Sequence, residues 1–187
     1  MRALAAVLAL VVLAGCLAGT PATDPGTTTG LSPQATPPGD GGLRVTVTEV
    51  VDGDTIKIAH PNGSRDSVRL LGVDTPEVHV ANTPDEYEGV PETEAGERCL
   101  RRAGETASAY ARDRLAGETV TVRFDERADR RGYYGRLLGY VVVGGESFNH
   151  ALLREGHARV YESTFTERER YEATEAEARA ARRGLWA

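Results

Sequence analysis

Hydrophobic and polar residues alternate along five short stretches of the chain, and alternation with a period of two predicts half-buried β-strands. Turn residues, Asp52-Gly53 and Pro61-Asn62-Gly63, separate the first three stretches, so these strands are expected to run antiparallel in succession. The glycine pair Gly144-Gly145 closes the last stretch. The predicted strands cover residues 43–48, 55–59, 65–73, 118–124 and 137–143.

A different pattern, with apolar residues near the spacing of helical turns, occupies residues 94–115 between the third and fourth strands. Ala103, Ala107 and Leu115 follow this spacing, and they predict the first helix of the chain. Gly104 lies in the middle of this helix. Because glycine is a poor helix former, we expect the helix to break there.

Two further helices are predicted after the last strand. Ser147 is a suitable N-cap for a helix over residues 148–155. Residues 164–167, Thr-Phe-Thr-Glu, resemble a capping box, which predicts a last helix that runs to about Arg183. Five short strands with a helix between the third and fourth are typical of the OB-fold. The predicted fold class is therefore α+β, a five-stranded β-barrel with about three helices.

Composition agrees with one globular domain. The chain has 187 residues, of which 40% are hydrophobic and 27% are charged, and both fractions are ordinary for a folded protein. Residues 43–187 are predicted to form this domain, because they contain all the periodic stretches and suffice for a hydrophobic core.

The residues before this domain have the features of an export signal and a tether. Arg2 precedes an apolar run over residues 4–13, which is short for a membrane span. Leu13-Ala14-Gly15-Cys16 resembles a lipobox, in which cleavage leaves a lipid-modified cysteine; the alternative is a plain cleaved signal. We therefore predict a signal peptide over 1–15 and a disordered Thr/Pro/Gly-rich tether over 16–42. The domain would be lipid-anchored to the membrane outside the cytoplasm, or secreted.

Charge and cysteine content limit the possible functions. The formal net charge of −6 does not suggest a strong sequence-independent grip on nucleic acid, although local basic clusters could provide one. Cys99 is the only cysteine besides Cys16, so the mature domain has no disulfide framework, and Cys99 is expected to be a free buried thiol. The histidines show no metal-ligand spacing; they are His60, His79, His150 and His157.

The stretch from Val68 to Glu77 is the first candidate for chemistry. It begins as a strand and ends at Thr75-Pro76, because proline cannot donate to a sheet and holds the preceding residue extended. Arg69 lies on the strand, and Asp74 and Glu77 lie in the loop around the proline. Loops on a rigid scaffold often carry function, although Asp-Thr-Pro is also a common turn opener.

Two other stretches carry polar residues in suggestive patterns. Asp52-Gly53-Asp54 places two aspartates around a turn, with the second at the root of a strand. Residues 127–136 combine four arginines with Tyr133 and Tyr134, and basic residues among aromatic ones suit the backbone and bases of a nucleic acid. Each stretch by itself could be an ordinary solvated turn.

Three motifs in this order resemble those of the thermonuclease, or staphylococcal nuclease-like, family. They are Val51-Asp52-Gly53-Asp54-Thr55, the stretch from Arg69 to Glu77, and Tyr134-Gly135-Arg136. The resemblance extends over about residues 43–186. It implies an OB-fold enzyme, a calcium-dependent phosphodiesterase that cleaves DNA and RNA and leaves 3′-phosphate ends. It further implies a preference for single strands, and we expect a monomer.

The resemblance implies a role for each matching residue, and elementary chemistry agrees with these roles. Carboxylate and carbonyl oxygens suit Ca²⁺, guanidinium groups neutralise charge on a phosphate, and a carboxylate can deprotonate water. The implied metal ligands are Asp54, Asp74 and the carbonyl of Thr75, the general base is Glu77, the phosphate clamp is Arg69 and Arg136, and Tyr134 with Tyr133 contacts the nucleotide.

The sequence departs from the family pattern in two places. Glu162 and Thr164 stand where the family has further tyrosines, which puts base stacking at that subsite in doubt. The stretch after Glu77 is longer than in short family members, and residues 78–97 are acidic. Because like charges repel unless a cation intervenes, this insertion is expected to form a second, weaker cation site or a mobile lid; the alternative is a solvated loop.

Other classes of function remain open alongside the nuclease. The chain could be a non-catalytic nucleic-acid-binding OB-fold lipoprotein, or a structural lipoprotein domain. The complete set of Asp54, Arg69, Asp74, Glu77 and Arg136 favours the nuclease, because a binding or structural domain has no need of it.

The predicted lipid attachment at Cys16 gives the first test. Cys16→Ser removes the thiol that a lipid would modify, so the protein is expected to appear in the medium or to remain unprocessed. Fractionation of cells into membranes and medium measures this. A Cys16→Ser protein that stays with membranes as the parent does would contradict the anchor.

Overall fold

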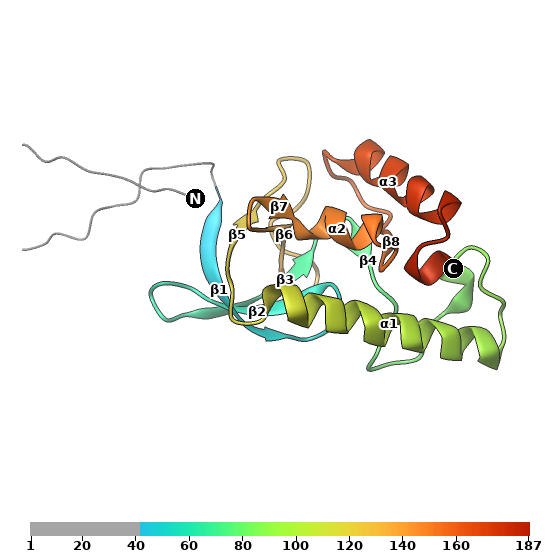
Figure 1. Cartoon of the computed structure of the whole chain (residues 1–187). Helices are drawn as coiled ribbons and strands as arrows, with labels where there is room; N and C mark the ends of the chain where they lie inside the picture. The colour runs from blue at the N-terminus through green and yellow to red at the C-terminus, as the bar shows by residue number, and fades with distance from the viewer. Residues whose placement is uncertain (1–41) are drawn as a thin grey trace, which may run out of the picture. The chain divides into compact units, whose positions relative to one another are not determined.

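The computed structural model describes residues 42–187, so the predicted signal peptide, Cys16 and tether lie outside the described residues. Figure 1 shows the arrangement of the elements. The strands are β1 (Leu43–Val50), β2 (Thr55–Ala59), β3 (Arg65–Leu70), β4 (Val73–Asp74), β5 (Thr119–Arg123), β6 (Leu137–Val143), β7 (Glu146–Ser147) and β8 (Arg159–Val160). The helices are α1 (Glu94–Leu115), α2 (Phe148–Arg154) and α3 (Arg168–Ala180), with short 3-10 helices η1 (Pro84–Glu86) and η2 (Gly184–Trp186).

Five of the strands close into a barrel. β1 pairs antiparallel with β2 and β5, β2 pairs with β3, and β5 pairs with β6. A parallel pairing of β3 with β6, in which Arg69 lies opposite Leu138, joins the two ends of the sheet. This closed mixed barrel with three helices confirms the predicted OB-fold. Within residues 42–187, no helix has the length and apolar character needed to cross a membrane.

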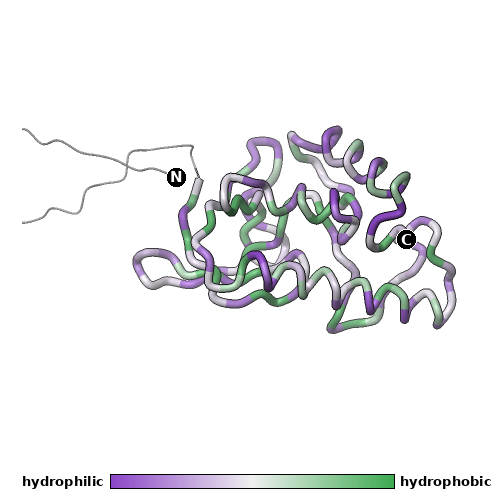
Figure 2. Tube along the Cα trace, viewed as in Figure 1, coloured by the Kyte–Doolittle hydropathy of each residue, from purple (hydrophilic) through white to green (hydrophobic). Residues whose placement is uncertain are grey.

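The core fills the barrel and the space between the barrel and its helices. Along the barrel strands, buried apolar residues alternate with exposed or partly exposed ones. Figure 2 shows hydrophobic and hydrophilic residues following one another along the trace of these strands. Phe148 and Leu152 of α2 and Tyr171 of α3 are fully buried against this core. The barrel residues of the core include Val45, Val47, Ile56, Ile58, Val68, Leu70, Val120, Val122 and Val141.

A buried amide fastens α2 to the barrel. The Asn149 side chain accepts a hydrogen bond from the Val141 backbone N–H at 2.9 Å. It also donates to the carbonyl oxygens of Leu71 at 2.9 Å and Gly139 at 3.2 Å. Because a buried amide without partners is costly, these bonds fix how α2 sits on β6 and on the chain after β3.

The predicted strand over 65–73 is two elements. Gly72 has a positive φ of 76°, which turns the chain after β3. A Cβ at this position would lie 2.6 Å from the ring of Phe165, so the turn also needs glycine for space. β4 then leaves the barrel and pairs antiparallel with β8.

Three other sequence-based expectations are wrong. The stretch from Thr164 to Glu167 forms no capping box, because Glu167 itself is the N-cap of α3 and no side chain caps the helix. The neighbouring Thr166 bonds to Asp125 through its N–H and hydroxyl, at 2.8 and 3.1 Å. α3 begins at Arg168 and ends at Ala180, short of Arg183. Cys99 is exposed rather than buried.

The third wrong expectation concerns Gly104, which does not break α1. The helix is continuous, and Gly104 is buried on the side that meets the loop after β4. A Cβ there would collide with the carbonyl oxygen of Pro76. Glycine at this position therefore allows a close approach between α1 and the loop that carries Glu77.

This approach predicts that Gly104→Ala destabilises the protein. Alanine favours an isolated helix by about 1 kcal/mol over glycine, but overpacking against backbone typically costs about 1–3 kcal/mol. We expect the collision to dominate because a carbonyl next to proline moves little, so the midpoint of thermal unfolding should fall. Glu105→Ala, at an exposed position of the same helix, is the control and should leave the midpoint nearly unchanged. A Gly104→Ala protein as stable as the parent would contradict the collision.

Candidate active site

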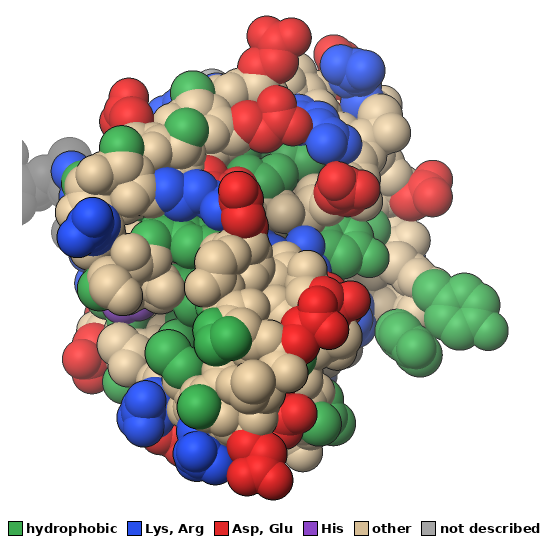
Figure 3. Space-filling view, turned by 90° about the vertical axis from the view of Figure 1, so that its right-hand side faces the viewer, with side chains coloured by type: hydrophobic (Ala, Val, Ile, Leu, Met, Phe, Trp, Pro, Cys, Tyr) green, Lys and Arg blue, Asp and Glu red, His purple; other side chains and the backbone are tan. Residues whose placement is uncertain are grey.

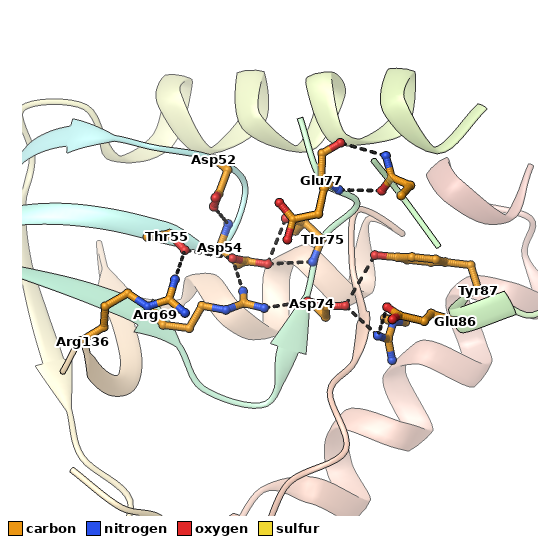
Figure 4. Close-up of polar contacts among 12 residues, drawn as sticks. Asp52, Asp54, Thr55, Arg69, Asp74, Thr75, Glu77, Glu86, Tyr87 and Arg136 are labelled. Atoms are coloured by element: carbon orange, nitrogen blue, oxygen red, sulfur yellow. Dashed lines mark hydrogen bonds and ion pairs between the residues drawn. The ribbon is translucent and has the colours of Figure 1, made fainter. Parts of the chain in front are cut away.

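Asp54 is the buried centre of the polar residues at one end of the barrel. It directly precedes β2, is 4% exposed, and accepts hydrogen bonds from the Thr75 N–H at 2.7 Å and hydroxyl at 3.0 Å. The Thr55 hydroxyl bonds to its other oxygen at 3.2 Å. Arg69 forms an ion pair with the same carboxylate. Figure 4 shows these groups directed toward one another.

The guanidinium of Arg69 joins two carboxylates. It pairs with Asp54 on one side and with Asp74 at 2.6 Å on the other. Strand pairing explains this position, because Arg69 lies directly opposite Thr55 in the β2–β3 register. Arg136, which precedes β6, reaches the same place from the next strand and donates to the Thr55 hydroxyl at 3.4 Å.

Asp74 has further partners that the sequence analysis missed. Arg159 lies opposite Asp74 in the β4–β8 pairing and contacts its carboxylate at 2.8 Å. The same guanidinium contacts Glu86 at 2.9 Å and lies 5.1 Å from the ring centroid of Tyr87. The Tyr87 hydroxyl is 3.5 Å from Asp74. The sequence gives no signal for this cluster, because the two-residue strands β4 and β8 are too short to show periodicity.

Glu77 is fixed through its backbone by Asn82. Its N–H donates to the Asn82 side-chain oxygen at 2.7 Å, and its carbonyl accepts from the same amide at 2.9 Å. The carboxyl group is partly buried. Burial raises the pKa of Glu77 above its usual value, and repulsion from Asp52 and Asp74 raises it further, against the opposing effect of Arg69.

The insertion after Glu77 is held against the domain by specific contacts. Tyr87 is 3% exposed and Asn82 is buried. Glu86 pairs with Arg159, and Glu88 pairs with Arg179 of α3 at 2.7 Å. Since arginines neutralise these two acidic residues, the contacts do not support the predicted second cation site. The mobile lid stays a prediction, and these anchors argue against it.

Of the implied calcium ligands, Asp54 accepts two hydrogen bonds from Thr75, and Arg69 joins Asp54 to Asp74. The hard oxygen atoms of the implied ligands suit calcium chemically. Among residues 42–187, no three His, Cys, Asp or Glu side chains are arranged so that they could hold a metal ion, and Arg69 links the two aspartates. Negative charge is nevertheless crowded here. Repulsion from Asp52 and Asp74 contributes to the raised pKa of Glu77, because these acidic groups lie close together.

A cleft of about 680 Å³ opens beside the two arginines. Arg69 and Arg136 line it together with Tyr133 and Tyr134, which are 97% and 79% exposed and contact each other edge to face.

Tyr161, a residue the sequence analysis passed over, also lines the cleft and is half exposed. It supplies an aromatic ring close in sequence to the positions at which Glu162 and Thr164 lack one.

The closed barrel and the cluster of arginines and carboxylates at its end define an OB-fold protein with a charged site at one end of its barrel. The profile of the family described as "Staphylococcal nuclease homologue" matches residues 67–187, and the chain belongs to this family. The match includes every site residue discussed above except Asp52, Asp54 and Thr55, which precede it.

Individual relatives agree with the family assignment. An uncharacterized protein of Methanocaldococcus jannaschii is 40% identical over 75% of this chain and 70% of its own length. The endonuclease YncB of Bacillus subtilis is 36% identical over 77% of this chain and 62% of its own length. The thermonuclease of Staphylococcus hyicus is 33% identical over 75% of this chain and 73% of its own. The chain thus spans less than two thirds of YncB.

The bonds between Asn82 and Glu77 lead to a prediction that does not depend on activity. Asn82→Ala removes the acceptor of the Glu77 N–H, so exchange of this amide hydrogen with solvent should become faster, by NMR or mass spectrometry. Asn62→Ala is the matched control, because Asn62 makes the same kind of bond to the Ser64 N–H in a distant turn. Unchanged exchange at Glu77 in Asn82→Ala would mean that the loop is held by other contacts.

Proposed function

We propose that this protein is a nuclease that hydrolyses phosphodiester bonds in DNA and RNA, with Ca²⁺ as its cofactor. The observation that carries the proposal is the convergence of Arg69 and Arg136 beside Glu77, at a cleft lined by exposed tyrosines. Membership of the family, and relatives named endonuclease and thermonuclease, support it. From the leader residues alone, we further propose that the enzyme acts outside the cytoplasm.

In this proposal the two arginines bind the reacting phosphate. The developing transition state carries more negative charge on its phosphoryl oxygens than the substrate does. Guanidinium groups held in advance by strand pairing stabilise that charge without reorganising. Arg69 and Arg136 project from neighbouring strands of a closed barrel, which keeps their separation constant.

Glu77 acts as the general base. Its carboxylate takes a proton from the attacking water as the new bond between oxygen and phosphorus forms. The bond from phosphorus to the 5′ oxygen breaks, the leaving oxygen takes a proton from solvent, and the products are a 3′-phosphate and a 5′-hydroxyl end. The raised pKa of Glu77 makes it a stronger base than a glutamate at its usual pKa. Calcium, held by Asp54, Asp74 and the Thr75 carbonyl, would supply positive charge to the phosphate and orient the water.

Purified protein is expected to cut single-stranded DNA and RNA with Ca²⁺ present and to stop when a chelator is added. Glu77→Gln removes the base but keeps the shape of the side chain, so kcat should fall by about 10²–10⁴-fold. Glu92→Gln, an exposed change within the insertion, is the control and should cut as the parent does. Undiminished cutting by Glu77→Gln would reject the role given to Glu77.

The arginine variants must allow for the burial of Asp54. Truncation of Arg69 would leave the buried charge of Asp54 short of a partner. Arg69→Lys keeps the positive charge but loses the planar guanidinium group, which can make two parallel hydrogen bonds to a phosphate. Cutting should therefore fall while the fold persists. A folded protein that binds oligonucleotides with Ca²⁺ present but cuts none would favour the alternative, a non-catalytic binding module.

A further inference from the structure

A second hollow lies on the outer face of the barrel, next to the cleft. Its volume is about 410 Å³, and it shares Tyr134 and Arg136 with the cleft. The two shared residues therefore stand on the ridge between the two hollows. Apart from Gly135, which lies between the two shared residues, the other residues that line the second hollow come from β1, β2 and β3, and they include Lys57, Arg65 and Ser67.

The strand register places this hollow in line with the reacting phosphate. Successive pairs across β2 and β3 are Thr55 with Arg69, Lys57 with Ser67, and Ala59 with Arg65. Because side chains two residues apart point to the same face of a strand, all three pairs face the same side as Arg69. Each step of two residues advances about 6.6 Å along the strand, so Arg65 lies about two such steps from Arg69.

The charges in the hollow favour an anion. Asp66 is neutralised by Arg131, which contacts its carboxylate at 2.6 and 3.0 Å. Lys57 pairs with Glu49 at 2.9 Å, but both side chains are about half exposed, and exposed pairs of this kind are weak. In the described part of the chain, exposed Arg65 has neither a hydrogen bond nor an ion pair from its side chain.

This local positive charge contrasts with the rest of the protein. The chain has a formal net charge of −6, and acidic and basic side chains are interspersed on the face drawn in Figure 3. The whole surface thus offers little attraction for a polyanion. A strand of nucleic acid would have to be guided by local groups, and the β2–β3 face supplies them next to the cleft.

We propose that the second hollow is a subsite for the continuing strand of a single-stranded polynucleotide, whose reacting phosphate lies at Arg69 and Arg136. The strand passes over Tyr134 and follows β2 and β3, where Arg65 and Lys57 contact neighbouring phosphates. An exposed tyrosine on the ridge favours single strands, because an unpaired base offers its face for stacking. The subsite rests on the proposed nuclease function and gives it a preference for longer substrates.

Binding is the first test, with the parent and variant proteins in chelator so that no cutting occurs. The probe is a fluorescent single-stranded oligothymidylate of about 12 nucleotides, within the range that OB-folds cover. Anisotropy over a series of salt concentrations gives Kd and its salt dependence. Arg65→Ala should raise Kd and reduce the slope of log Kd against log salt by about 0.7, the value for one lost phosphate contact on a single strand.

Two further variants separate this effect from damage to the fold. Glu49→Gln removes the acid that pairs with Lys57, so it should lower Kd, which a damaged protein would not do. Arg98→Ala removes an equal charge from an exposed position on α1, away from the hollow, and should leave Kd and slope unchanged. If Arg65→Ala and Arg98→Ala behave alike, or Glu49→Gln weakens binding, the subsite is rejected.

Cutting with Ca²⁺ distinguishes failure of the subsite from failure of the nuclease. The ratio of kcat/KM on the oligothymidylate to kcat/KM on a thymidine dinucleotide should fall in Arg65→Ala. A parent protein that cuts neither substrate defeats the nuclease proposal. A parent that cuts both, with an unchanged ratio in Arg65→Ala, defeats the subsite alone. Tighter binding of a duplex than of the single strand would also overturn the subsite as proposed.

Discussion

The ion cluster around Asp54 is the interaction on which the rest of the site depends. A carboxylate that is 4% exposed is stable only when its oxygens are satisfied and its charge is paired. Thr75 supplies hydrogen bonds from the loop after β4, and Arg69 supplies charge from β3. The requirement to satisfy one buried group therefore ties three segments together. Because Arg69 is tied on both sides, its guanidinium is held at the edge of the cleft before any ligand arrives.

The loop that carries Glu77 is fixed from two directions, and neither depends on the Glu77 side chain. On the side of α1, Gly104 lets the helix approach the carbonyl of Pro76 more closely than any other residue would allow. On the other side, the Asn82 side chain accepts a hydrogen bond from the backbone N–H of Glu77 and donates one to its carbonyl oxygen. The carboxyl group is thereby left free for chemistry while its backbone is rigid. The insertion supports this loop, because the ring of Tyr87 is buried and its hydroxyl lies beside Asp74.

The sequence predicts those parts of the fold that local periodicity determines. The strands over 55–59 and 137–143 and the helix over 94–115 have the bounds that alternation and helical spacing indicate. Contacts between distant segments were not predictable in the same way. Gly104 reads as a helix breaker until the carbonyl of Pro76 is known to face it, and Arg159 has no recognisable role until β8 is paired with β4. The motif residues were found because each motif is contiguous in sequence, whereas their supporting residues are not.

The charge balance of the site bears on how a nuclease here would accept its substrate. The positive charge of Arg69 is shared by two aspartates, and Asp74 also contacts Arg159, whose charge is shared in turn with Glu86. Asp52 and Glu77 add acidic groups whose pKa values are already raised. A phosphodiester brings one more negative charge to this place. Arg136 alone offsets only part of the repulsion, since it makes one long bond to a neutral hydroxyl. Positive charge added at the carboxylates would therefore strengthen the binding of an anionic substrate, which is the electrostatic reason that a divalent cation and this arrangement of residues belong together in the proposed enzyme.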